Sequence, residues 1–123
     1  MVTLVNKGTA SASEILAGSL QDNERSILMG EKTYGKGLIQ SLKSLGEDSG
    51  LAITVASYLT PKGNNIQGQG MIPDKLLDLP DISEYGSSDD KWVRNAELFL
   101  ESILDNEEVS IQNSEVDNEK LKN

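Results

Sequence analysis

The hydrophobic pattern of the first twenty residues constrains the fold more than any other feature of this sequence. Residues 2–6 (VTLVN) form a short apolar run followed by Lys-Gly, a pattern typical of a buried strand that ends in a turn. From Ser11 to about Leu20 the apolar residues recur at helical spacing, and Ser11-x-x-Glu14 fits a capping box at the start of a helix. A strand, a turn and a helix in succession predict an α/β fold.

Five further segments are predicted along the rest of the chain. Residues 26–29 and residues 51–60 indicate strands, the second being rich in β-branched residues. Residues 38–45 fit both a helical and an alternating pattern, and we favour a strand. Residues 61–70, with three Gly and two Asn, predict a loop or hairpin. Residues 91–104 carry the apolar stripe of an amphipathic helix docked on the core.

Length and composition bound the folded part of the chain. The 123 residues are enough for one domain, but the hydrophobic content of 37% is low for a self-contained one. We therefore expect the ordered part to end near Leu104, with an acidic, disordered tail over residues 106–123. A strand that begins at Val2 without a preceding turn or cap suggests a missing upstream portion.

Charge and residue types exclude several classes of function. The formal net charge of -9 argues against a nucleic-acid partner, which is held by clustered Lys and Arg. The absence of Cys and His excludes thiolate nucleophiles, disulfides, Ser-His-Asp triads and the usual zinc shells, and no cofactor is implied. No apolar run approaches the roughly 20 residues that cross a bilayer, and the N-terminus lacks the segments of a signal peptide.

The first segment that could carry chemistry is the run of small residues from Gly8 to Glu14 at the predicted strand-to-helix junction. A serine at a helix N-terminus lies beside free N–H groups that can stabilise an oxyanion, and small neighbours let a substrate carbonyl approach. Ser11 is therefore a candidate nucleophile. Capping boxes far outnumber nucleophiles, so the motif alone indicates only a capped helix.

The second segment is GEKTYGKG, residues 30–37, in which Lys36 has a glycine on either side. A free lysine titrates near ~10.4 and acts as a base only when it is neutral, a state that burial among apolar groups favours. Tyr34, Leu38 and Ile39 are the local candidates for such burial. Without other context, a lysine in Gly-Lys-Gly indicates an exposed turn.

The same segment also resembles a phosphate-binding loop. Gly30-x4-Gly35-Lys36 follows a predicted strand, and a helix over residues 38–45 would complete the pattern. The match fails at Gly37, where a Ser or Thr hydroxyl should ligate magnesium. Nucleotide binding is therefore a minor alternative.

Taken together, the segments resemble one family. The strings LVNKGTASASEILAGSLQDN, GEKTYGKGLIQSL, GLAITVASYLTPKG and IQGQGMIPD, which lie within residues 2–74, resemble the carboxyl-terminal processing peptidases, or tail-specific serine proteases. The resemblance implies a crotonase/ClpP-like α/β core. It assigns residues 1–80 to the C-terminal part of that catalytic core, residues 81–105 to a linker and helix, and residues 106–123 to the acidic tail.

The resemblance also implies roles for individual residues. Ser11 would be the nucleophile, Lys36 its general base and Gln40 a residue that supports the base, while Asp22 and Gly35 would be further supporting residues. In a chain without histidine, a Ser-Lys dyad is the main way to activate this serine.

Two points of geometry follow from these roles. The N–H of Ala12, directly after the nucleophile, is the natural local donor to the oxyanion. Gln40 would lie about 13 Å from Lys36 along a straight strand, so a bulge at Gly35 or Gly37, or a helical turn, must bring the two together.

GKGLIQSL and GLAITVASY resemble the cyanobacterial and chloroplast branch most. That branch trims a photosystem II reaction-centre precursor, which implies a protein C-terminus as substrate and the thylakoid lumen or periplasm as location. Family members also carry an upstream PDZ domain and a glycine loop with a second oxyanion donor, which implies that this chain has little activity without that half as partner. The alternative is a non-catalytic fragment that docks through a sheet edge at Val2 or through the Trp92 helix.

Overall fold

The computed structural model describes residues 1–78 and 86–120, the last of these (106–120) by backbone alone. The chain divides into two units, Met1–Leu79 and Pro80–Asn123. Each unit is described by itself below.

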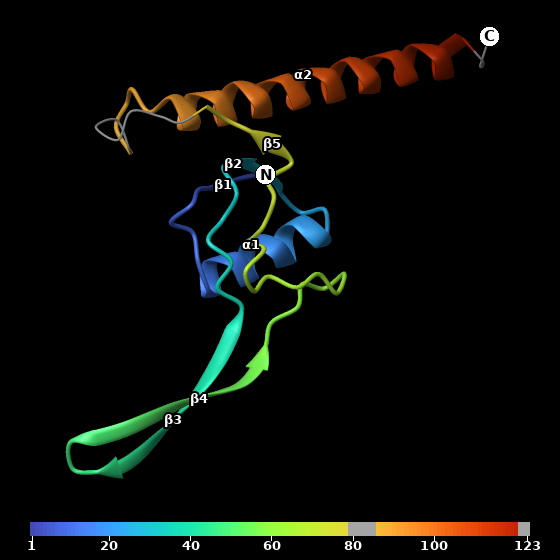
Figure 1. Cartoon of the computed structure of the whole chain (residues 1–123). Coiled ribbons are helices and arrows are strands. Elements are labelled where there is room, and N and C mark those ends of the chain that lie inside the picture. Colours follow the sequence, from blue (N-terminus) through green and yellow to red (C-terminus); the bar gives the residue numbers. More distant parts are fainter. Residues whose placement is uncertain (79–85, 121–123) are drawn as a thin grey trace. The chain divides into compact units, whose positions relative to one another are not determined.

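The first unit is built on a small parallel sheet (Figure 1). Strand β1 (Val2–Val5) pairs with β2 (Ile27–Gly30), and β2 pairs with the short β5 (Lys75–Leu76) in the order β1-β2-β5. The chain crosses from β1 to β2 through helix α1 (Ala12–Asp22). The predicted strand, turn and helix of the first twenty residues are therefore confirmed, and parallel pairing requires such a crossover.

A compact apolar core lies between α1, the sheet and the loop that follows the hairpin. Its members are Val5, Ala17, Leu28, Ile66 and Met71, each at most 7% exposed. They come from β1, α1, β2 and the loop, so one small cluster joins four segments that are far apart in the sequence.

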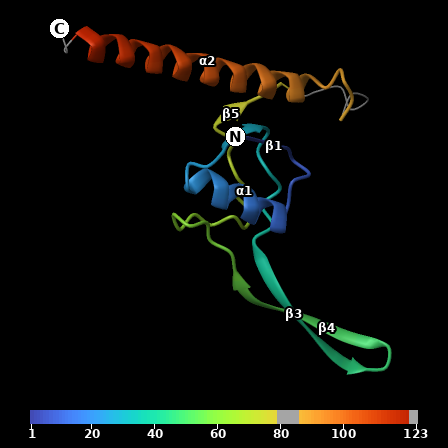
Figure 2. The ribbon, with the colours of Figure 1, turned by 180° about the vertical axis from the view of Figure 1, so that it is seen from behind.

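The second sheet is a hairpin of β3 (Leu38–Gly46) and β4 (Ser49–Ser57). The strand favoured for residues 38–45 is thus confirmed, and a phosphate-binding loop is ruled out because the helix that it needs is absent. In Figures 1 and 2 the hairpin runs away from the parallel sheet, with α1 between them. Most of its residues are exposed.

The loop after β4 returns to the segment that precedes β3. The amide of Gly68 donates to the carbonyl oxygen of Gly35 at 3.0 Å, and that of Thr33 donates to the carbonyl oxygen of Met71 at 3.1 Å. Gly70 has φ of 66°, and a Cβ there would lie 2.4 Å from the carbonyl oxygen of Thr33. Only glycine allows this approach.

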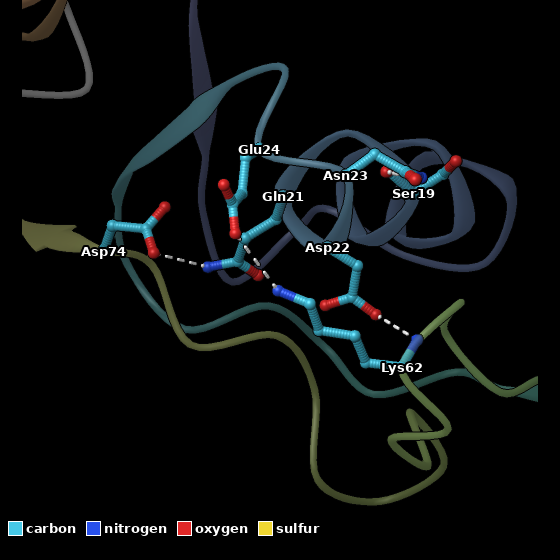
Figure 3. A network of polar contacts seen from close by, with 7 residues as sticks. All are labelled: Ser19, Gln21, Asp22, Asn23, Glu24, Lys62 and Asp74. Carbon is cyan, nitrogen blue, oxygen red and sulfur yellow. Dashed lines mark hydrogen bonds and ion pairs between the residues drawn. The ribbon is translucent and has the colours of Figure 1, made fainter.

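Polar contacts fix the C-terminal end of α1 (Figure 3). Asp22 accepts a hydrogen bond from the backbone amide of Lys62 at 2.8 Å. The side-chain amide of Gln21 donates to Asp74 at 2.9 Å, and Asp74 in turn accepts the backbone amide of Leu28 at 2.8 Å. The end of the helix is thereby tied to the loop and to β2.

The second unit contains α2 (Lys91–Lys120), and Asp90 is its N-terminal cap. The Asp90 carboxylate accepts the backbone amides of Gly86 and Trp92, each at 2.9 Å. The bond from Gly86 lowers the pKa of Asp90, burial opposes the change, and the bonds from the helix amides add to it. No helix in the described ranges is long and apolar enough to span a bilayer.

The helix α2 is longer than the sequence predicts. It continues past Leu104 to Lys120, whereas a disordered tail was expected from residue 106. The physical reason lies in residue type: residues 105–120 contain no Gly and no Pro, and the acidic composition that indicated disorder is compatible with a solvated helix.

We predict that Leu28→Ala lowers the free energy of unfolding by about 3 kcal/mol, because a fully buried leucine leaves a cavity. The matched control is Leu42→Ala on the hairpin, where the side chain is 82% exposed, and it should change stability by less than about 0.5 kcal/mol. Urea denaturation of the chain measures both. Equal losses for the two variants would contradict the core described above.

Candidate active site

Ser11 stands at the N-terminus of α1 in an unusual backbone conformation. Its φ is 57° and its ψ is -120°. Ser11 and Glu24 are the non-glycine residues with positive φ in the parts of the chain that the structure describes. Such a conformation costs about 1–3 kcal/mol and persists only where surrounding contacts enforce it. The turn after β1 therefore delivers Ser11 to the helix terminus under strain.

The contact that enforces this position comes from Glu14, which is fully buried. Its Oε2 accepts the backbone amide of Ser11 at 2.9 Å and the backbone amide of Lys36 at 2.8 Å. Its Oε1 accepts the hydroxyl of Thr33 at 2.5 Å and the backbone amide of Gly35. Two nitrogens bonded to one oxygen lie less than about 6 Å apart, so one carboxylate holds the Ser11 and Lys36 backbones side by side.

Glu14 is held in its charged form by these donors. Burial raises the pKa of Glu14, but the hydrogen bonds from Thr33 and from the amides of Gly35, Lys36 and Ser11 together bring it below its usual value. The residue was predicted to close a capping box, and its bond to the Ser11 amide is formed. Its contacts to residues 33–36 have no signal in the local sequence, because they join segments about twenty residues apart.

The Lys36 segment is held from the other side as well. The amide of Tyr34 donates to the carbonyl oxygen of Thr9 at 3.0 Å, which ties the segment to the turn before Ser11. Gly35 has φ of 88°, and the amide of Gly37 donates to Oε1 of Gln67 at 2.9 Å. Gln67 was missed in the sequence because a glutamine in a glycine-rich loop has no distinctive pattern.

The apolar burial that a lysine base needs is not found among the described residues, and the alternative of a lysine in an exposed turn is the one that fits. Lys36 itself is exposed, Tyr34 is 69% and Leu38 is 39% exposed, and Ile39 is half-buried. The reason is that the hairpin turns away from the core just after residue 37, so these side chains have no apolar layer to pack against.

A cavity of about 470 Å³ lies beside this segment. It brings Lys36 and Gln40 together, and it includes Ala10, the residue before Ser11. Its lining consists of Gly8, Ala10, Tyr34, Gly35, Lys36, Leu38, Gln40 and Gln67.

The expected bulge at Gly35 or Gly37 is wrong in position. Residues 31–37 are not in a strand, so the distance along a straight strand does not apply to them. The register shift lies between Ile39 and Gln40, where the partner residues are Ala56 and Thr54.

The two remaining predicted residues lie at opposite ends of α1. Ala12 is the first helical residue and is exposed, and its amide belongs to the first turn, which has no acceptor within the helix. Asp22 is the last helical residue, about 15 Å along the helix axis from Ala12. The Thr60 hydroxyl, and then the Lys62 amide, lower the pKa of Asp22. The structure thus places Asp22 away from Ser11, where it fixes the loop.

The cavity is lined by one amine and two side-chain amides, those of Lys36, Gln40 and Gln67. Ser11, at the N-terminus of α1, is joined to the Lys36 segment through the Glu14 carboxylate. Among the residues described, no group of three Asp or Glu is arranged to hold a metal ion.

We predict that Glu14→Gln lowers the free energy of unfolding by about 3 kcal/mol, because the NH2 group of glutamine would face two donors whose hydrogen bonds it cannot accept. Glu24→Gln is the matched control: its side chain is 86% exposed, and its change should stay within about 0.5 kcal/mol. Urea denaturation at neutral pH compares them. A Glu14→Gln variant as stable as the control would contradict the clamp.

The lowered pKa of Glu14 also predicts a pH dependence. A carboxyl group whose folded pKa is below its unfolded value of about 4.3 stabilises the fold fully above that value, and the contribution is lost as the pH falls through the folded pKa. The free energy of unfolding should therefore fall from pH 5 towards acid, and more steeply in the parent than in Glu14→Gln. Denaturation midpoints measured at several pH values test this, and parallel curves would refute it.

Comparisons with known proteins place the chain in a family. The model of peptidase family S41 matches residues 1–77. A carboxyl-terminal-processing protease of Synechocystis sp. is 59% identical over 83 residues, which are 68% of this chain and 19% of the relative. Carboxyl-terminal-processing peptidase 2, chloroplastic, of Arabidopsis thaliana is 60% identical over 77 residues, or 63% of this chain and 15% of the relative.

A solved structure titled photosystem II D1 C-terminal processing protease superposes with a TM-score of 0.60 at 56% identity, covering 63% of this chain and 20% of that one. The chain spans about a fifth of the length of the relatives that it matches. Since the family model covers well over half of the chain, the chain belongs to peptidase family S41.

Proposed function

We propose that this chain supplies the nucleophile and the general base of a serine-type peptidase that processes protein C-termini. One observation carries the proposal: Oε2 of the buried Glu14 binds the backbone amides of both Ser11 and Lys36, next to a cavity that Lys36 and Gln40 line. This arrangement fixes the Ser11 and Lys36 backbones, whose side chains would have to come together as nucleophile and base.

The proposed reaction uses the groups of this cluster in order. Ser11 Oγ attacks the scissile carbonyl while Lys36 Nζ takes its proton, and the same ammonium then protonates the leaving amine. The Ala12 amide, at the free end of α1, stabilises the oxyanion. Because the Ser11 and Lys36 amides share one oxygen of Glu14, their backbones lie close together, and the long lysine side chain is able to span that distance.

Gln40 is the proposed partner of the base, since it lines the cavity together with Lys36. A lysine is an effective base only when neutral, and an apolar cover favours that state. Because the described residues leave Lys36 exposed, the proposal requires that a bound peptide, or polypeptide beyond this chain, covers it.

The wider properties are proposals that rest on the relatives. The names of the relatives support protein C-termini as substrate, with a photosystem II D1 precursor as the specific candidate. Their chloroplastic and cyanobacterial origin supports the thylakoid lumen or periplasm as location. The parallel strands with their crossover helix fit part of a crotonase/ClpP-like core. An upstream half with a PDZ domain and a second oxyanion donor would be the functional partner.

A second candidate is a fragment that docks onto a partner without catalysis. One observation favours it: β1 has β2 on one side and no neighbour on the other among the described strands, so its edge is open to pairing. The two functions differ in whether Ser11 is reactive.

We predict that a small serine-directed fluorophosphonate labels Ser11 when this chain replaces the aligned segment of the Synechocystis relative, that Ser11→Ala abolishes the labelling, and that Lys36→Ala slows it about 1,000-fold. Lys36→Arg should fail as well, because a guanidinium does not give up its proton. Ser13→Ala, exposed in the same helix, is the matched control and should label as the parent does.

Cleavage is measured on the chain and on a graft in which it replaces the aligned segment of the Synechocystis relative, with a peptide of unstructured C-terminus as substrate. The graft should cleave, and the same substitutions should abolish cleavage. If the folded chain and the graft both leave Ser11 unlabelled, the docking function replaces the peptidase.

A further inference from the structure

The loop of residues 65–70 forms one wall of the cavity through Gln67. The backbone N–H of Gln67 donates to Asn65 Oδ1 at 3.0 Å, so a local turn fixes the Gln67 backbone. A Cβ on Gly37 would lie 2.7 Å from that same nitrogen. The two backbones are thus in direct contact, and Gln67 has little freedom to move away from the Lys36 segment.

The hydrogen bond to Gly37 determines how the Gln67 side chain is oriented. The Gly37 amide is a donor, so the atom that meets it at 2.9 Å is Oε1. The Nε2 group, with two N–H donors, is therefore the other end of the side-chain amide. Among the residues that the structure describes, no hydrogen bond from Nε2 is found, although the residue is only half-exposed.

The chemistry of the lining indicates what this donor would meet. The chain has a formal net charge of -9, yet no Asp or Glu lines the cavity. Its polar side chains are Tyr34, Lys36, Gln40 and Gln67, which between them offer hydroxyl, amine and amide donors. A cavity rich in donors and free of carboxylates suits oxygen acceptors, and an extended peptide presents these at regular intervals as main-chain carbonyls.

We propose that Gln67 is a substrate-binding residue whose Nε2 donates a hydrogen bond to a main-chain carbonyl of the peptide, while its Oε1 holds Gly37 beside Lys36. The proposal rests on the proposed peptidase function and adds a contact that specifies the peptide main chain. One side chain then couples the placement of the base segment to the placement of the substrate.

The test is Gln67→Glu in the graft and in the chain. A carboxylate still accepts the Gly37 amide, but it has no donor and it repels a carbonyl oxygen. We expect KM for the peptide to rise about tenfold while kcat changes less than about threefold, because an interaction made equally in ground and transition states is lost. Gln69→Glu is the matched control: it adds the same charge to an exposed position of the same loop and should leave KM unchanged.

A second measurement separates a binding role from a structural one. Replacing single amides of the peptide by thioamides weakens one acceptor at a time. A thioamide at one particular position of the peptide should raise KM for the parent and have no further effect on KM for Gln67→Glu. If KM is unchanged in Gln67→Glu, or rises equally in Gln69→Glu, the proposal for Gln67 is overturned.

Fluorophosphonate labelling distinguishes this failure from failure of the proposed function, since the probe carries no peptide. Labelling of Ser11 at parental rate with unchanged KM would overturn the role of Gln67 alone. Absence of labelling in both the folded chain and the graft would overturn the peptidase function and the role of Gln67 with it.

Discussion

The buried carboxylate of Glu14 is the interaction on which the rest of this structure depends. Removing a charge from water is costly, and here the cost is offset by four donors: the Thr33 hydroxyl and the amides of Ser11, Gly35 and Lys36. These donors belong to the start of α1 and to the segment after β2, which the bond from the Tyr34 amide to the Thr9 carbonyl oxygen also brings together. The apolar core has only five buried members in the described part of the chain, so a polar contact of this strength is a large share of what fixes the first unit.

The same contact explains how a strained serine is maintained. Ser11 has φ of 57°, a conformation that few residues other than glycine adopt. Glu14 lies one helical turn away and accepts the Ser11 amide, so helix formation and the strained conformation reinforce each other. The same oxygen of Glu14 also accepts the Lys36 amide, so the Lys36 backbone is fixed relative to Ser11. The hydrogen bonds that hold Ser11 and Lys36 near each other are thus the same bonds that stabilise the buried Glu14 carboxylate.

How far the sequence predicted this structure depends on the range of each interaction. The strand at residues 2–6, the helix beginning at Ser11 and the strands over 38–45 and 51–60 follow from periodicity and turn residues, which act over a few positions. Family resemblance named Lys36 and Gln40, and the cavity brings them together. The bonds from Glu14 to residues 33–36 and the bond from Gly37 to Gln67 could not be predicted, because they join residues 19 to 30 positions apart through tertiary packing. The exposure of Lys36, in contrast, agrees with the exposed turn that Gly-Lys-Gly indicates locally.

The exposed hairpin separates two requirements of the proposed reaction. Leu42 is 82% and Val55 is 60% exposed, so the strands that follow Lys36 carry apolar surface without a layer against it. The Ser11 and Lys36 backbones, in contrast, are positioned within the first unit, by Glu14 together with the bonds from Tyr34 to Thr9 and from Gly37 to Gln67. The backbone geometry is therefore set within the first unit, whereas the desolvation that keeps a lysine neutral would have to come from a ligand or partner that covers the cavity. A ligand that covers the cavity would supply both the acceptor for Gln67 and the low-polarity environment for Lys36, so that binding and activation of the base would occur in the same step.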